Sequence, residues 1–375
     1  MGSNFSNGEK KLYWRCLKKV DNQPDQKSYV PGFDLIDHFK QLATDKKTGE
    51  TTDKIPDTKG PGKLDYIITK EELDTACNTL KRGKAPGLDN ILNEMLTPFV
   101  HKFPETILTL FNSVLKNNKI SHDWLVSSIT AIHKKDDKSD PNNYRGISVM
   151  SNIGKLFLII MNNRLTKYAV ENDLLSPGQL GFVKGNRTSD PHIILHNLIQ
   201  KYCHKQKKKL FGCFVDFSKA FDSVSRNLLL KKLREKGVDG NFLNIIKTIY
   251  TNDESCVKIG NKRSDMFKPN KGVRQGCVLS PLLFNIFLAD LEEQLNICGG
   301  NPIINREERI SCILWADDIL ILSESEETLQ NKLDTLASYC QKNELLVNTN
   351  KTQCMVFNRT GRTDKHTFYI NGAHH

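Results

Sequence analysis

The sequence lacks the features that mark membrane, secreted and zinc-binding proteins. Its longest candidate apolar run, residues 156–161, has six residues, whereas a membrane-spanning helix needs roughly 18 or more. The first residues are polar and contain no apolar signal region. The 10 cysteines form no Cys-x-x-Cys pair and have no histidines at zinc-finger spacing, which argues against a zinc site and a disulfide scaffold. We therefore expect an intracellular protein, cytoplasmic or nuclear, with no membrane partner.

Hydrophobic and charged residues are present in ordinary amounts, but the positive charge is distributed unevenly. A hydrophobic content of 38% with 26% charged residues is typical of soluble globular proteins, and the length predicts two or more subdomains in one body. Residues 116–275 contain 29 Lys and Arg against 14 Asp and Glu, a net charge of +15, so the remainder carries −4 of the total +11. This segment favours a polyanionic partner, and a solvated charged surface is the simpler alternative.

Two adjacent carboxylates, Asp317 and Asp318, lie between two apolar stretches, residues 313–316 and 319–322. The pattern predicts a strand, a two-residue turn and a second strand, with the Asp pair at the tip. Ionised carboxylates between apolar stretches are costly unless they are paired or coordinate a metal. A plain solvated turn would explain the pair alone, so the metal interpretation depends on a further acid.

That further acid is Asp216, which ends the short apolar run of residues 210–215. The run predicts a buried strand, followed by a helix that Ser225 caps and Gly237 ends. Mg²⁺ prefers oxygen ligands and commonly uses one or two carboxylates together with substrate phosphates. Two such ions about 3.5–4 Å apart stabilise the attacking and leaving oxygens of phosphoryl transfer. Three carboxylates from two strand ends therefore predict a two-metal site.

Several sequence blocks, in the same order along the chain, resemble those of reverse transcriptases. Motifs A, B, C and D of that family resemble residues 214–222, 272–285, 315–318 and 348–352. Upstream, residues 83–89, 143–148 and 179–188 resemble the finger blocks of non-LTR (LINE-type) retrotransposons. A lone Asp pair is a weak signal, whereas seven blocks in order are specific. Trp315 replaces the usual Tyr of motif C, Gly146 a common Pro, and Val183 a usual Arg.

The resemblance implies RNA-templated addition of dNTPs to a DNA 3′ end, with RNA template, DNA primer and dNTPs as partners. The catalytic and metal-binding set that it implies is Asp216, Asp317 and Asp318, with the backbone carbonyl of Phe217 as a further metal ligand. The expected cofactor is Mg²⁺, as two ions, with Mn²⁺ as an alternative. Asp318 has the weakest claim, because in the family it often orients rather than ligates.

The nucleotide-binding residues that the resemblance implies are Arg145, Phe217, Phe221, Gln275, Gly276 and Lys351. Arg145 is expected to contact the triphosphate, because a planar guanidinium binds phosphate oxygens bidentately, and Lys134 or Lys135 is a candidate helper. Phe221 lies five residues after Asp216, at the family's steric-gate position, although a core aromatic residue would fit there too. Lys351 is expected to protonate leaving pyrophosphate.

The expected fold is α+β, and the resemblance implies a right-hand polymerase with an antiparallel palm sheet and packed helices. The expected division is an N-terminal extension and linker at 1–60, with a short helix, fingers at 61–204, palm at 205–358, and a tail at 359–375 before an absent thumb. The predicted helices cover 70–80, with a capping box at residues 69–72, then 98–118, 156–165 and 192–202, one from Ser280 as cap to about 295, and one after a capping box at 323–326. The predicted strands also include 129–133, 345–347 and 354–357.

Two other functions remain open. An inactive nucleic-acid-binding remnant would fit the basic charge and the missing thumb, although the intact acids argue against it. An RNA-directed RNA polymerase would fit Asp216 and Asp222 as a spaced acid pair, although Phe221 and the block at 274–276 argue against it.

Overall fold

The computed structural model describes residues 35–44, 57–58, 60–260, 262–305, 308–361, 366–370 and 373–374. Most of the predicted N-terminal extension, residues 1–60, lies outside the described residues. Its described part contains helix α2 (Leu35–Ala43). Within the described residues, no helix combines the length and the apolar character needed to cross a membrane.

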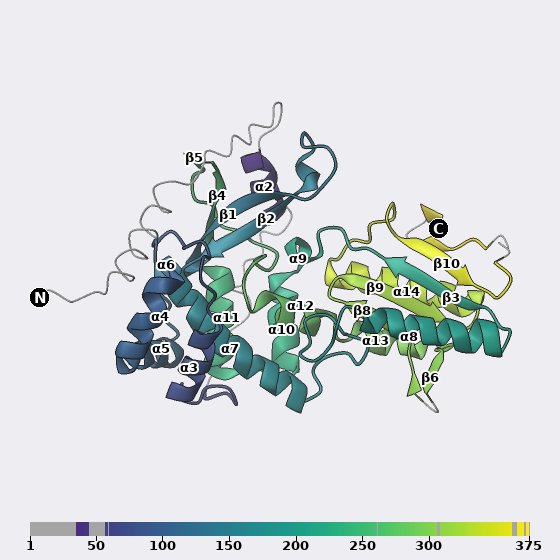
Figure 1. Ribbon diagram of the computed structural model, residues 1–375, viewed down its shortest axis with the longest axis horizontal. Helices are drawn as coiled ribbons and strands as arrows, with labels where there is room; N and C mark the ends of the chain where they lie inside the picture. Colours follow the sequence, from purple (N-terminus) through teal and green to yellow (C-terminus); the bar gives the residue numbers. More distant parts are fainter. Residues whose placement is uncertain are drawn as a thin grey trace, which may run out of the picture.

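The described chain forms two lobes, each built on a four-stranded sheet (Figure 1). The first sheet has the order β2-β1-β4-β5, with β1 (Val126–His133), β2 (Tyr144–Met150), β4 (Glu254–Ile259) and β5 (Lys262–Arg263). The second has the order β10-β3-β9-β8, with β3 (Leu210–Val215), β8 (Cys312–Trp315), β9 (Asp318–Ser323) and β10 (Gln353–Phe357), and all its neighbours are antiparallel. Two short hairpins pair β6 (Ile303–Asn305) with β7 (Glu308–Arg309) and β11 (Tyr369–Ile370) with β12 (Ala373–His374).

The helices cover both sheets and fill the space between the lobes (Figure 1). They are α3 (Lys70–Asn78), α4 (Asn93–Lys102), α5 (Pro104–Asn117), α6 (His122–Leu125), η2 (Pro141–Asn143), α7 (Asn152–Glu171), α8 (Asp190–Ile199), η3 (Gln200–Lys205), α9 (Ala220–Ser223), α10 (Arg226–Glu235), α11 (Gly240–Thr251), α12 (Ser280–Leu288), α13 (Leu291–Ile297) and α14 (Glu326–Asn343). The mixed helix-and-sheet class predicted from sequence is thus confirmed.

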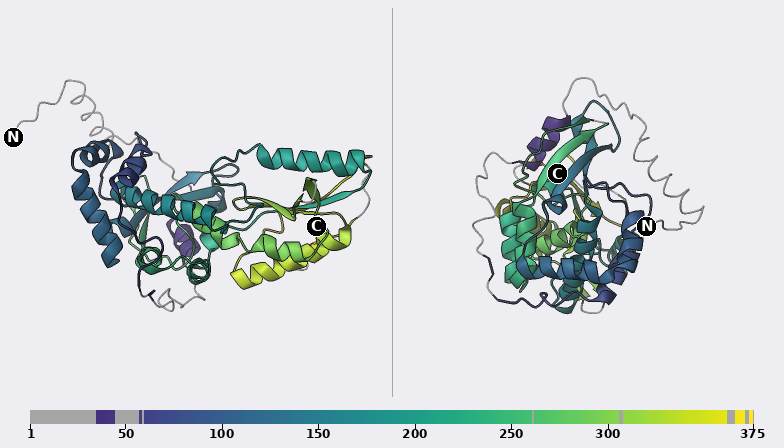
Figure 2. Two further views of the ribbon diagram at one scale, coloured as in Figure 1. Left: turned by 90° about the horizontal axis from the view of Figure 1, so that it is seen from below. Right: turned by 90° about the vertical axis from the view of Figure 1, so that its left-hand side faces the viewer.

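Strands β3, β8 and β9 of the second sheet are mostly buried, because apolar side chains point alternately to both faces of the sheet. Leu210 and Leu320 belong to a cluster with Leu198 of α8, whereas Cys213 and Ile321 belong to the main core. That core also contains the apolar face of α14, including Leu329, Leu333 and Leu336. Figure 2 shows α8 and α14 on opposite sides of the strands. The sheet is therefore held between two helical layers, and its polar residues gather at the strand ends.

Several predicted elements are confirmed, and others are shifted. The capping box of Thr69 and Glu72 opens α3, as predicted. The helix predicted over 98–118 is two helices, α4 and α5, that meet at Phe103, because Pro104 cannot continue the hydrogen-bond ladder of the first. Strand β1 and helix α7 contain the strand and the buried helix predicted there, and α8 and η3 together span the whole predicted 192–202 helix.

Three predictions in the C-terminal part of the described chain, at α12, at α14 and at residues 345–347, were wrong in detail. Ser280 is the first residue of α12 rather than its cap, and the predicted helix is divided into α12 and α13. The cap of α14 is Ser325, whose hydroxyl accepts from the Thr328 amide, rather than Ser323. Residues 345–347 form no strand but contribute a single bridge between Phe217 and Val347.

The two lobes are not continuous in sequence. Helix α11 and strand β4 follow residue 205 yet pack with the first lobe, whereas α8 precedes it and packs on the second sheet. The chain therefore passes between the lobes more than once. The functional boundaries at residues 60, 204 and 358 stay predictions.

Candidate active site

Strands β8 and β9 form the predicted hairpin, but its two-residue turn is one residue earlier than expected. The last pair of the ladder is Trp315 with Asp318, so the turn consists of Ala316 and Asp317. Ala316 has a φ of 59°, the sign that a type II′ turn requires at its first central position. Asp317 is half-buried in the turn, and Asp318 is exposed at the start of β9.

The third acid, Asp216, lies at the same end of the sheet. Strand β3 pairs with β9 in a register that joins Val215 to Ile319. Because the strands are antiparallel, Asp216 follows β3 at the point where β9 begins with Asp318. The structure thus brings together the three acids predicted from two separate strand ends.

The electrostatics of this acid group favour a cation. Burial raises the pKa of Asp317, and the nearby Asp216 carboxylate raises it further. Burial also raises the pKa of Asp318, with added repulsion from Asp317 and Asp216. Among the described residues, no three His, Cys, Asp or Glu side chains are arranged closely enough to form a ready metal-ligand cluster. The donor chemistry and the mutual repulsion still fit hard divalent cations, which bind carboxylate oxygens.

The segment after α14 holds Asp216 in place. The Asn348 amide nitrogen donates to the Asp216 carbonyl (2.8 Å), and Asn348 Nδ2 donates to Asp216 Oδ2 (2.9 Å). The Asp216 amide donates to Thr352 Oγ1 (3.3 Å). Lys351 belongs to the same turn and is exposed. Sequence reasoning assigned Asn348 no role, although it lies in the block resembling motif D.

Basic side chains from three separate segments gather near the acids: Lys134 and Arg145 act on the acids, and Lys351 acts on Lys134. Burial lowers the pKa of Lys134, and the positive charges of Arg145 and Lys351 lower it further, whereas Asp222 and Asp216 act in the opposite direction. Arg145 lies on β2 opposite Ile132 of β1, and its positive charge also acts on the Asp317 carboxyl. The sequence did not decide between Lys134 and Lys135 as the helper of Arg145. The structure places Lys134 in this basic group.

The loop that contains Gln275 and Gly276 is bonded to strand β2 and to helix α9. The Ser148 amide on β2 donates to the Gln275 carbonyl (2.8 Å), and Gln275 Nε2 donates to Asp222 Oδ2 (2.8 Å). Gly276 has a φ of 103°, which L side chains rarely adopt, and a Cβ there would lie 3.0 Å from the Ser148 carbonyl oxygen, so a side chain would be strained and crowded. Burial raises the pKa of Asp222 to about 6.

Phe221 and Phe217 differ in their surroundings. Phe221 stacks on Phe284 of α12, with ring centroids 4.7 Å apart and planes 15° apart, yet its side chain is only half-buried. The core-aromatic interpretation is therefore correct in part, and part of the residue remains exposed. Phe217 is 4% exposed, belongs to the main core and forms a bridge with Val347.

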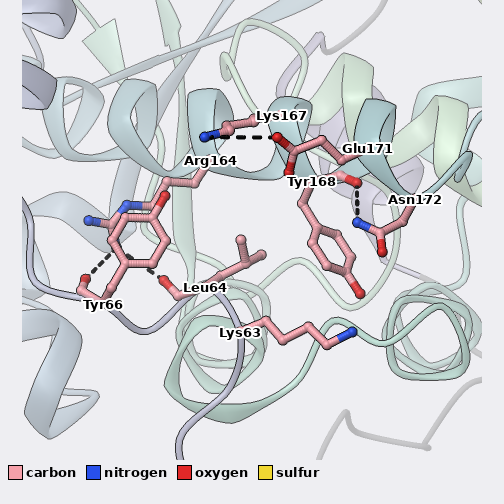
Figure 3. Close-up of a pocket in the computed structure, with 8 residues that line it drawn as sticks. All are labelled: Lys63, Leu64, Tyr66, Arg164, Lys167, Tyr168, Glu171 and Asn172. Atoms are coloured by element: carbon pink, nitrogen blue, oxygen red, sulfur yellow. Dashed lines mark hydrogen bonds and ion pairs between the residues drawn. The ribbon is translucent and has the colours of Figure 1, made fainter.

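A cavity of about 300 Å³ lies on α7, lined by Lys63, Tyr66, Arg164, Lys167 and neighbouring residues (Figure 3). The five N–H donors of Arg164 are used in bonds to both Glu72 carboxylate oxygens and to the carbonyls of residues 64, 66 and 67. Its guanidinium lies 3.8 Å from the ring centroid of Tyr66. Arg164 thus fastens the chain before α3 to α7, and this cavity is not part of the acid site.

Comparison with known proteins places the chain in a family. Residues 132–370 match the family model described as reverse transcriptase (RNA-dependent DNA polymerase). The chain is 28% identical over 368 residues to a probable RNA-directed DNA polymerase from transposon BS of Drosophila melanogaster, covering 90% of this chain and 40% of that protein. It is 28% identical over 271 residues to a Pol polyprotein from a type-1 retrotransposable element R2 of Nasonia vitripennis, covering 72% of this chain and 26% of that protein.

Among solved structures, a telomerase from Candida tropicalis in complex with a fragment of telomeric RNA is similar over 74% of this chain and 47% of that chain, with 14% identity and a TM-score of 0.47. The chain spans less than half the length of these relatives. The family model nevertheless covers well over half of this chain. The chain therefore belongs to the reverse transcriptase family.

Proposed function

We propose that this chain catalyses RNA-templated DNA synthesis as the reverse transcriptase part of a non-LTR retrotransposon protein. The observation that carries the proposal is the group of three acids at the ends of β3 and β9, with Lys134 and Arg145 near them and Lys351 near Lys134. Family membership and relatives that are named RNA-directed DNA polymerases support it. In this proposal the first lobe supplies the fingers and the second sheet the palm.

Asp216, Asp317 and Asp318 would hold two Mg²⁺ ions, with the Phe217 carbonyl as a further ligand and Mn²⁺ as an alternative ion. When bound, such ions stabilise the charge that develops in phosphoryl transfer. The half-buried position of Asp317 keeps its carboxylate partly shielded from water, which strengthens its electrostatic interactions. Asn348 keeps the Asp216 carboxylate from rotating away, because one of its oxygens already accepts a hydrogen bond.

The basic group would bind the triphosphate of an incoming dNTP. Arg145 presents a planar guanidinium to the phosphate oxygens, and Lys134 adds a second positive charge. Lys351 lies in the turn that holds Asp216 and would protonate leaving pyrophosphate. The loop of Gln275 and Gly276 would approach the nucleotide with its backbone, since Gly276 carries no side chain and a larger residue would be strained there.

Phe221→Val is expected to raise ribonucleotide incorporation relative to dNTP incorporation without abolishing activity. A smaller side chain removes the ring of this half-buried residue and would open space for a ribose 2′ hydroxyl, while Phe284, on which the ring stacks, stays in the core. Such a loss of steric rejection is worth on the order of 1–3 kcal/mol, or about 10- to 200-fold. Single-nucleotide incorporation kinetics with matched dNTP and NTP measure the ratio. Phe284→Leu is the control, because it removes the buried partner of the same aromatic stack and leaves Phe221 in place. Unchanged discrimination in Phe221→Val would leave Phe221 as a core residue only.

Primer extension on an RNA template separates the proposed function from its two alternatives. A reverse transcriptase extends a DNA primer with dNTPs. An RNA-directed RNA polymerase would prefer NTPs, and an inactive remnant would bind the duplex without extending it. In all three cases, binding of the duplex should weaken steeply with salt, because contacts between basic side chains and phosphates release counterions. Affinity therefore does not separate the three functions, whereas primer extension does.

A further inference from the structure

The segment of residues 176–181 packs against the hairpin that bears Asp317. Gln179 pairs with Leu314 of β8 in a parallel bridge. The Leu314 amide donates to the Gly178 carbonyl (2.9 Å), and the Leu180 amide donates to the Leu314 carbonyl (2.8 Å). The segment therefore extends the edge of the second sheet up to the catalytic turn.

The side chain of Gln179 bonds the turn itself. It is 4% exposed, and its Oε1 accepts from the Gly181 amide (2.9 Å) and the Ala316 amide (3.0 Å). Its Nε2 donates to the Ala316 carbonyl (3.5 Å). One amide side chain thus engages both backbone groups of the residue whose φ is 59°. An alanine in that conformation is strained and depends on its surroundings to stay there.

Buried polar side chains on α12 and α13 hold the segment of residues 176–181 in place. Glu292 Oε2 accepts from the Gly178 amide (2.8 Å) and also bonds the Ser176 hydroxyl. Asn285 Nδ2 donates to the Gly181 carbonyl (2.8 Å). A Cβ on Gly181 would lie 2.4 Å from the Ala316 nitrogen, so the two backbones approach as closely as a glycine allows. Helices α12 and α13 therefore fix the segment that carries Gln179, and so fix the position of its side-chain amide.

We propose that Gln179 is a positioning residue, which holds the Ala316–Asp317 turn in its strained conformation and so keeps the Asp317 carboxylate beside Asp216. The proposal rests on the proposed function for its catalytic consequence, but the contact can be tested without activity. Gln179 does not reach the nucleotide in this role. It acts through the backbone of Ala316.

The test uses Gln179→Met, which keeps the volume of the side chain and removes both bonding groups. The kcat for dNTP addition should fall by about 10- to 100-fold, the loss expected from a small displacement of a catalytic group, with the KM for dNTP little changed. Hydrogen exchange at the Ala316 amide should become faster, while exchange in β3 stays slow. Gln179→Asn, which is shorter by one methylene, is the milder variant if the first does not fold.

A second substitution separates positioning from general stability. Glycine adopts a positive φ readily, so Ala316→Gly in the Gln179→Met background should restore much of the lost kcat. Asn93→Leu is the matched control. It removes another buried amide, on α4, whose Nδ2 donates to the Lys81 carbonyl (2.8 Å), and it should lower Tm without changing kcat.

The outcomes distinguish this proposal from the proposed function. Unchanged exchange at Ala316 in Gln179→Met would overturn the contact. Faster exchange with unchanged kcat, or a lowered kcat that Ala316→Gly does not restore, would overturn the positioning role. A wild-type chain that extends no primer would instead contradict the proposed function, and exchange at Ala316 would still decide whether Gln179 holds the turn.

Discussion

Asp216→Asn and Asp317→Asn should each abolish nucleotide addition while leaving the fold intact. Each change removes one negative oxygen ligand from a site that is expected to bind two divalent cations. The loss of several kcal/mol of transition-state stabilisation corresponds to at least about 10³-fold in rate. The fold should survive, because Asn has the same shape as Asp and because burial and like charges already disfavour the ionised form of Asp317.

The measurement is single-turnover incorporation of one dNTP, with circular dichroism and thermal unfolding on the same samples. Asp334→Asn is the control, since Asp334 is exposed on α14 and lies outside the acid group. Incorporation within a few-fold of wild type by either active-site variant, with an unchanged circular dichroism spectrum, would show that the acid is not a metal ligand.

Asp253→Asn should strongly lower the free energy of unfolding. Asp253 is 1% exposed, and its carboxylate accepts from Arg226 Nη1 (2.8 Å) and Nη2 (3.0 Å) and from Arg274 Nε (3.3 Å). Both guanidiniums are buried as well, so the substitution leaves two buried positive charges without a counter-charge. Breaking a buried ion pair by removing one partner costs roughly 3–5 kcal/mol.

Urea unfolding monitored by circular dichroism measures this loss. Glu235→Gln is the control, because the pair of Lys231 and Glu235 is exposed and should contribute less than about 0.5 kcal/mol. A loss below about 1 kcal/mol in Asp253→Asn would mean that other groups neutralise the two arginines. The network also bears on function, because Arg226 Nε donates to the Gly272 carbonyl (3.0 Å) in the loop that leads to Gln275.

The acid group could be predicted from sequence because its signal is local. An apolar run of strand length that ends in Asp216 indicates a buried strand with a polar end, and the Asp pair between two apolar runs indicates a hairpin. The order of the blocks that resemble the family then indicated that the strand ending in Asp216 and the hairpin with the Asp pair belong to one site. The exact turn residues were missed, because the hairpin register depends on the φ of Ala316, which no pattern of apolar residues encodes.

The supporting residues could not be predicted, because their partners are distant in the sequence. Gln179 bonds Ala316 across 137 positions, and Asn348 bonds Asp216 across 132. A buried glutamine or asparagine has no periodicity of its own, and its partner is a backbone group that every residue carries. Gln179 and Asn348 both lay within blocks that resemble the family, and that was the available signal for them.

Extension of a DNA primer annealed to an RNA template by the wild-type chain, one nucleotide at a time with Mg²⁺, tests most directly whether the chain is a reverse transcriptase. The chain should add the dNTP complementary to the template base, in preference to the other dNTPs and to the matching NTP. EDTA should stop the reaction, and added Mg²⁺ should restore it. Binding of the RNA–DNA duplex without any extension, or extension that ignores the template base, would show that the chain is not an RNA-templated DNA polymerase.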